Sequence, residues 1–289
     1  MTPAQRVASQ FAASPAAIGA LILFSVVVLA AALAPWISPQ DPYDLAQLQL
    51  IDSRLPPFAR SAAGAIRWLG TDDQGRDMLS AILYGLRTSL VVGLASTAIG
   101  FAIGVSLGLA AAWFGGWIDA LVMRLADLQL SFPSILIALV LLAVFGQGLD
   151  KIVLALVAVQ WAYYARAARA SAAIERRKDY IEAAIALALP DARILFHHLL
   201  PNCLPPLLVL AAVQVAAAIT LEATLSFLGL GLPITQPSLG LLIANGFNYL
   251  LSGHYWISFF PGIALLLTVV GVNLVADRLR DVLDPRTHG

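Results

Sequence analysis

Six apolar stretches recur along this chain, and each is long enough, or nearly so, to cross the core of a lipid bilayer as an α-helix. Such a crossing takes about 20 helical residues. The fourth stretch is the shortest, although Gln160, Trp161, Tyr163 and Tyr164 extend it into the interface, where aromatic rings are favoured. We therefore predict an all-α membrane protein with six transmembrane helices, at residues 16–37, 90–114, 128–145, 152–165, 203–227 and 257–276.

The composition supports this class and excludes others. Hydrophobic residues make up 60% of the 289 residues and charged residues only 12%, whereas a soluble domain carries about 25% charged residues. The formal net charge is zero and no basic block is present, so we expect no nucleic-acid partner. Cys203 is the only cysteine, which excludes an intramolecular disulfide and favours a packing role.

The first stretch has a second interpretation, as a cleaved signal peptide. Arg6 precedes the apolar run, and Ala32-Leu33-Ala34 resembles a signal-peptidase site. However, the run exceeds the ~7–15 residues of a signal-peptide core, and the loop after it leads into further membrane segments. We therefore predict a retained first span.

The basic residues are distributed unevenly between the predicted loops. With the N-terminus inside, eleven Lys and Arg lie in inside segments and six in outside segments. Because Lys and Arg favour the cytoplasmic side, we predict that both termini are cytoplasmic. In the long outer loop, Asp72 and Asp73 are predicted to cap a short helix at about residues 74–86, since carboxylates satisfy free amides at a helix start.

A glycine pattern marks the second span. Gly100, Gly104 and Gly108 follow one another at four-residue spacing, and Gly93 lies on nearly the same face. Small residues in this arrangement allow another helix to approach closely in lipid. We interpret the pattern as helix packing.

A polar island interrupts the apolar stretches at residues 179–202, DYIEAAIALALPDARILFHHLLPN, which lies inside by the charge count. Pro190 divides it into two helical pieces, because proline suits a first turn but breaks a continuous helix. The second piece has an apolar side, and we predict that Pro201 ends it before the fifth span. A short, bent, two-helix element of this kind is well shaped to fit a partner's cleft.

Within this island, Glu182-Ala183-Ala184 followed by Leu200-Pro201 resembles the EAA loop of permease subunits in binding-protein-dependent ABC importers. That pattern usually has a glycine where this chain has Ala188. A turn with positive φ would disfavour alanine, whereas a helical conformation would accept it. The sequence leaves both conformations open.

Other stretches narrow the resemblance, and together they cover nearly the whole chain. The closest family is the C-type permease subunit of dipeptide, oligopeptide and nickel importers. The matching stretches are LGTDDQGRD at 69–77, GGWID at 115–119, Met123-Arg124, Asp127, Phe132-Pro133, EATLSFLGLG at 222–231 and NLVADRLRDVLDPR at 273–286.

The resemblance implies the type I ABC importer permease fold in a bacterial inner membrane. It also implies a pore shared with a second permease, two cytoplasmic ATPase subunits, an extracytoplasmic solute-binding protein and alternating access. We expect residues 1–60 to hold the first span and the start of the outer loop. Residues 61–289 would form the permease domain, with the coupling loop at about 166–202. The chain lacks a G-x-x-x-x-G-K-[ST] loop, so we expect it to be no enzyme, to bind no cofactor and to leave ATP and Mg to its partners.

The resemblance assigns ATPase coupling to Glu182, Ala183, Ala184, Ala188, Leu200 and Pro201. Glu182 would either dock on the ATPase or pair locally with Arg177 or Lys178. Glu222 is the only acidic residue in the fifth span, and a carboxylate there should face the bundle or a water-filled cavity. It could contact a substrate amine on the translocation pathway or a polar group of the second permease.

Other polar residues have weaker functional interpretations. His197 and His198 are adjacent and do not share a helix face, so we expect no metal site. Asp119, Arg124 and Asp127 suggest local scaffolding, with Arg124 pairing Asp127. The last outer loop could face the binding protein or be an ordinary polar loop, through Asn245, Asn248 and Tyr249.

The most specific function we predict is uptake of short peptides. Nickel, chelated or free, and glutathione are alternative solutes, because the binding protein usually selects the solute in this family. A secondary transporter would need ion-coupling residues in its spans, where Glu222 is the only evident candidate. A membrane-embedded enzyme would need a Ser/His/Asp or metal constellation, and none is evident.

Overall fold

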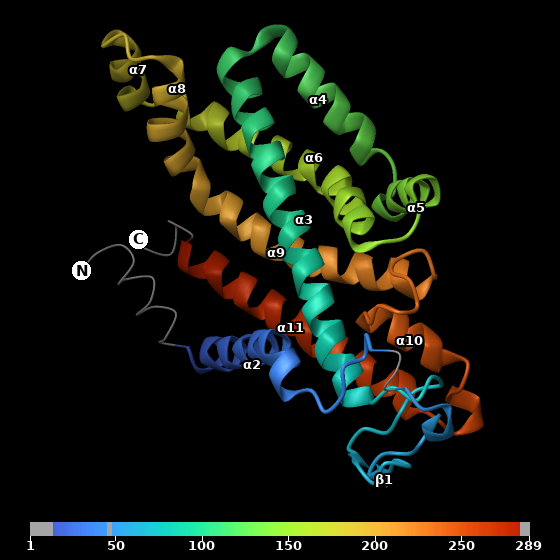
Figure 1. The fold of residues 1–289 in the computed structure, drawn as a ribbon. Helices are drawn as coiled ribbons and strands as arrows, with labels where there is room; N and C mark the ends of the chain where they lie inside the picture. Colours follow the sequence, from blue (N-terminus) through green and yellow to red (C-terminus); the bar gives the residue numbers. More distant parts are fainter. Residues whose placement is uncertain (1–13, 45–47, 284–289) are drawn as a thin grey trace.

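A computed structural model describes residues 14–44 and 48–283 as a bundle of helices (Figure 1). A small lobe lies at one end of the bundle, and the helices α7 and α8 lie at the other. The elements are α2 (Pro15–Ile37), η2 (Leu50–Asp52), β1 (Ala59–Arg60), β2 (Ile66–Arg67), α3 (Met78–Phe114), α4 (Gly116–Leu130), α5 (Ser134–Phe145), α6 (Leu149–Glu175), α7 (Asp179–Ala186), α8 (Asp191–Arg193), η3 (Ile194–Leu199), α9 (Leu200–Phe227), α10 (Leu239–Phe247), η4 (Leu250–Ser252) and α11 (Trp256–Leu283).

Within the described residues, four helices are long and apolar enough to cross a membrane. They are Pro15–Ile37, Met78–Phe114, Asp191–Phe227 and Trp256–Val282. The pair α4 and α5 makes a fifth if the two are counted as one span. The predicted helical membrane fold is therefore confirmed, whereas the count of six spans is not. The predicted fourth span lies within the longer helix α6, which continues to Glu175.

The predicted third span, 128–145, is wrong as a single helix. Its first residues belong to α4, which ends at Leu130, and its remainder forms α5 from Ser134. The two helices meet at a bend of 91°. Pro133 stands at this break, where its ring fixes φ and its nitrogen has no hydrogen to donate.

The separate helix predicted at 74–86 is also wrong. Helix α3 begins at Met78 and runs without a break to Phe114. Its cap is Asp77, whose carboxylate accepts a hydrogen bond of 2.8 Å from the Ser80 amide. Asp72 accepts from the Gln74 and Arg76 amides instead and folds a turn ahead of the helix. With 37 residues, α3 is about 55 Å long, well beyond the ~30 Å hydrocarbon core.

The predicted close packing along the second span is confirmed. Helix α3 packs along α6, and a Cβ atom at Gly104 would collide with the Trp161 carbonyl oxygen. A Cβ atom at Gly108 would collide in the same way with Ala165. Gly93 lies against Ile219 of α9 instead. The glycines therefore let α3 stand at the centre of the bundle against two neighbours.

Helix α2 is an integral part of the bundle. It packs against α3 and α11 and buries a stripe of small residues on that side. Phe24 and Leu23 lie against Gly271 of α11. This packing is what a retained first span requires.

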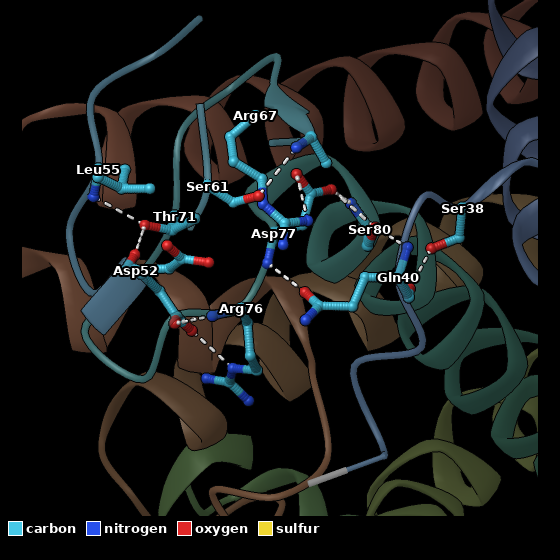
Figure 2. Close-up of polar contacts among 12 residues, drawn as sticks. Ser38, Gln40, Asp52, Leu55, Ser61, Arg67, Thr71, Arg76, Asp77 and Ser80 are labelled. Atoms are coloured by element: carbon cyan, nitrogen blue, oxygen red, sulfur yellow. Dashed lines mark hydrogen bonds and ion pairs between the residues drawn. The ribbon is translucent and has the colours of Figure 1, made fainter. Parts of the chain in front are cut away.

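Residues 38–44 and 48–77, between α2 and α3, form a compact lobe that contains two short strands. They pair antiparallel, with Ala59 opposite Arg67 and Arg60 opposite Ile66. The prediction of a wholly helical chain did not include them. Figure 2 shows Asp77, at the end of the lobe, surrounded by Gln40 and Arg67 of the lobe and Ser80 of α3.

Contacts with distant segments attach the lobe to the bundle. The indole of Trp256 in α11 donates a 3.1 Å hydrogen bond to the Thr71 carbonyl. The Arg76 guanidinium donates to the carbonyl of Ile234, in the loop between α9 and α10. The same guanidinium forms a 2.6 Å ion pair with Asp72, and both side chains are only 1% exposed. The lobe is therefore built around a buried ion pair.

Candidate functional site

The end of the bundle opposite the lobe carries α7 and α8, and we call residues 176–199 the α7–α8 element (Figure 1). Glu175, the last residue of α6, fixes the start of this element. The Glu175 carboxylate accepts hydrogen bonds of 2.6 Å from Lys178 Nζ and 2.6 Å from the Tyr180 hydroxyl. Burial opposes ionisation, but the bonds from Lys178 and Tyr180 outweigh it and hold the pKa of Glu175 below its ordinary value. Sequence reasoning missed these contacts of Glu175, although Glu175 and Lys178 have the spacing of a helical ion pair.

Ala188, two residues after the end of α7, has a left-handed backbone conformation with φ of 51°. Its amide donates to the Ile185 carbonyl at 2.9 Å, and the Leu189 amide donates to the Ala184 carbonyl at 3.2 Å. These two bonds form a Schellman motif, which usually places glycine at this position. Of the two conformations that the sequence left open, the structure therefore has the turn, with alanine in the place of glycine.

Replacing Ala188 with glycine is expected to stabilise the turn by about 1 kcal/mol, because the left-handed conformation costs a residue with a Cβ atom ~1–2 kcal/mol. Slower hydrogen exchange of the Leu189 amide would report this. Ala186→Gly, within α7, is the matched control and should instead speed exchange. Faster exchange in the Ala188→Gly variant would contradict the expectation.

The second half of the element continues directly into α9. The prediction that Pro201 ends the second helical piece is wrong, because Asp191–Phe227 forms one long helical segment. The helix tolerates proline at this position because Ile194–Leu199 widens into a π-helical turn. In this turn the Leu200 amide donates to the Leu195 carbonyl. Such wide turns are frequent at functional sites. The half-buried Leu200 and the exposed Pro201 thus begin the helix that enters the membrane.

The residues of the EAA pattern occupy two sides of α7. Ala184, with Ile181, is buried against Leu199 and its neighbours. Glu182 and Ala183 are exposed on the other side. Lys178 pairs with Glu175, and no ion pair among the described residues involves Glu182, so the local-pairing alternative is not formed in this conformation.

Exposed apolar side chains accompany Glu182 on the α7–α8 element. Leu187 is 74% exposed, Phe196 56% and Ile185 50%. Large apolar side chains gathered on one projecting element mark an interaction surface. Sequence reasoning missed these residues, because the pattern drew attention to Glu182 and to the alanines.

Glu222 lies deep in the bundle. It is 0% exposed, and its carboxyl oxygens accept hydrogen bonds of 2.8 Å from Ser89 of α3 and 2.7 Å from Ser226 of α9. The side chain thus faces the bundle interior, one of the two environments expected for it. In this conformation it joins two helices of its own chain.

Residues 100–289 match the family described as binding-protein-dependent transport system inner membrane component. The chain belongs to this permease family. Residues 2–57 of this permease also match the N-terminal TM domain of oligopeptide transport permease C.

Curated relatives resemble the permease over nearly its full length. It is 37% identical over 286 residues to the di/tripeptide transport system permease protein DppC of Pseudomonas aeruginosa, covering 99% of this chain and 93% of the relative. It is 39% identical over 287 residues to the dipeptide transport system permease protein DppC of Escherichia coli, covering 99% and 94%. Among solved structures, an inward-facing MetNI methionine ABC transporter matches with a TM-score of 0.56 and 20% identity, over 72% of this chain and 98% of that one. That likeness concerns the fold.

The connector helix α4 of the permease is fastened to α6. Asp119 accepts hydrogen bonds of 3.0 and 2.6 Å from Arg169, and Asp127 pairs with Arg166. The suggested pairing of Arg124 with Asp127 is therefore not formed, and the two carboxylates instead hold α4 to α6. The partners lie on a neighbouring helix, beyond the reach of a local spacing rule.

The remaining candidates occupy ordinary structural positions. His198 accepts through its carbonyl a 2.7 Å hydrogen bond from Asn202, and Cys203 is buried in the apolar core. Within the described residues, no group of three or more His, Cys, Asp or Glu side chains could hold a metal ion. Of the three residues predicted in the last loop, Asn245 lies within α10, Asn248 is exposed, and the Tyr249 ring centre lies 5.4 Å from Arg54 of the lobe.

Proposed function

We propose that this permease and a second permease subunit form the pathway through which an ATP-driven importer carries short peptides across a bacterial inner membrane. The observation that carries the proposal is the set of exposed residues on the α7–α8 element, which includes Glu182, Ile185 and Leu187. Family membership supports the role of a permease component. The names of the relatives, dipeptide and di/tripeptide permeases, support the substrate class.

Two ATPase subunits, which hold ATP and Mg, would dock on these residues. Leu187 and Ile185 offer apolar surface whose burial contributes about 25 cal/mol per Å² to binding. Glu182 adds a charge that helps to align the permease with the ATPase. The Glu175 contacts and the Ala188 turn hold the element at both ends of α7. An element braced in this way transmits the closing motion of the ATPases to α6 and α9.

The same arrangement supports an assignment of the two sides of the membrane. The α7–α8 element and both termini would be cytoplasmic, which agrees with the excess of Lys and Arg in those segments. The lobe between α2 and α3 would then be extracytoplasmic, where a solute-binding protein delivers its ligand. Glu222 would serve this pathway from within the bundle, by holding α3 to α9.

Uptake by the complete transporter in proteoliposomes tests this function. With the loaded binding protein outside, ATP inside should drive uptake of dipeptides and tripeptides, and a non-hydrolysable ATP analogue should not. Uptake that follows an ion gradient without ATP would identify a secondary transporter. Uptake of nickel or glutathione in place of peptides would support ATP-driven import and would contradict the proposed peptide substrate.

A further inference from the structure

Three hollows lie next to one another along one face of α9. The first, about 440 Å³, lies among α4, α6 and α9, and the second, about 100 Å³, lies among α5, α6 and α9. The third, about 400 Å³, lies between α9 and α11. Tyr163 lines the first two, and Ala217 and Leu221 line the last two. The hollows thus adjoin one another through shared lining residues, and we call the three together the recessed surface of α9.

Two amide side chains reach this surface from within apolar helices. Gln214, midway along α9, lines the second hollow, and Asn273 of α11 lines the third. In the described part of the chain, neither side chain forms a hydrogen bond. By contrast, Gln160 on the wall of the second hollow donates to the Gln214 carbonyl at 3.3 Å and accepts from Thr97 at 3.4 Å.

An amide without a partner inside a membrane is costly, by roughly 2–7 kcal/mol in a purely apolar environment. Gln214 and Asn273 are partly exposed on this surface, so water in a pathway, or a solute that replaces that water, would remove the cost. Amides both donate and accept hydrogen bonds, as peptide groups do. The second and third hollows are lined by neutral residues, with no carboxylate or imidazole to hold a metal cation.

We propose that Gln214 and Asn273 form a hydrogen-bonding wall of the translocation pathway that takes the peptide groups of a transported short peptide. This inference rests on the proposed peptide import and adds the surface that touches the solute. Thr220 and Thr224 of the third hollow donate to carbonyls of their own helix at 2.9 and 2.8 Å, which leaves their oxygens able to accept. Neutral contacts of this kind hold a solute weakly enough to release it.

Thiol labelling of the assembled transporter tests accessibility. In a Cys203→Ala background, which removes the only thiol of this chain, Gln214→Cys should react with a charged, membrane-impermeant thiol reagent. The transported dipeptide should slow this reaction. Val26→Cys, at a 57% exposed position on α2, is the control and should stay unlabelled because lipid covers it. Absence of labelling at position 214 in every nucleotide state would mean that the second permease covers this face, and would overturn the inference.

Transport by Gln214→Leu tests recognition. Peptide uptake per ATP hydrolysed should fall about tenfold, since one hydrogen-bonding partner is lost, and Gln214→Asn should restore part of it. Normal uptake by Gln214→Leu, or labelling that peptide does not slow, would overturn this inference while wild-type peptide uptake upholds the proposed function. Failure of wild-type peptide uptake would overturn both.

Discussion

Replacing Glu182 with lysine is expected to abolish transport-linked ATP hydrolysis while the chain still inserts into the membrane. The Glu182 carboxylate is exposed and has no ion-pair partner among the described residues. The fold of the permease therefore depends little on this side chain. Reversing a charge at a docking contact replaces attraction with repulsion, which costs ~2 kcal/mol or more, or about 30-fold in affinity. The measurement is the ATPase rate of the reconstituted transporter with and without peptide-loaded binding protein.

The control is Asp191→Lys, which makes the same charge reversal at an exposed first-turn residue of α8. It should retain most of the stimulation by loaded binding protein. Equal membrane content of the two variants would separate docking from insertion. Full stimulation in the Glu182→Lys variant would remove Glu182 from the coupling surface.

The features of this fold that sequence could predict are those set by local or periodic patterns. Long apolar runs predicted the helical membrane class, and Gly104 and Gly108 predicted a close helix neighbour. Pro190 correctly divided the α7–α8 element, since α7 ends at Ala186 and α8 begins at Asp191. The EAA spacing directed attention to this element.

The failures share a physical cause, which is that the decisive partner is distant in sequence. Asp119 pairs with Arg169, fifty residues away, so local spacing could not find it. Pro201 was expected to end a helix, but the wide turn before it depends on packing of Ile194 and Leu199 against the bundle. The conformation of Ala188 was likewise undecidable, because local sterics and the helix-ending hydrogen bonds favour opposite outcomes.

The lobe between α2 and α3 is the clearest case of a structure built on such distant contacts. Arg76 bonds to Asp72 nearby and to Ile234, 158 residues further along the chain. A sequence shows neither the burial of this pair nor its second anchor. The stability of the lobe should therefore depend strongly on one side chain.

Replacing Arg76 with methionine is expected to destabilise the lobe by about 3–5 kcal/mol, because the Asp72 carboxylate would stay buried without its counter-ion. Opening of the lobe exposes the chain around Arg54 and Arg60 to trypsin. If cleavage follows the open population, its rate should rise about 100-fold or more. Trypsin added outside right-side-out vesicles measures this rate.

Two further variants decide whether the lost ion pair is the cause. Arg87→Met makes the same substitution at an exposed arginine on α3 and should leave the cleavage rate unchanged. Arg76→Met combined with Asp72→Asn removes the stranded charge, so the double variant should recover part of the resistance. If the double variant is cleaved as fast as Arg76→Met alone, the anchor to Ile234 rather than the buried charge holds the lobe closed.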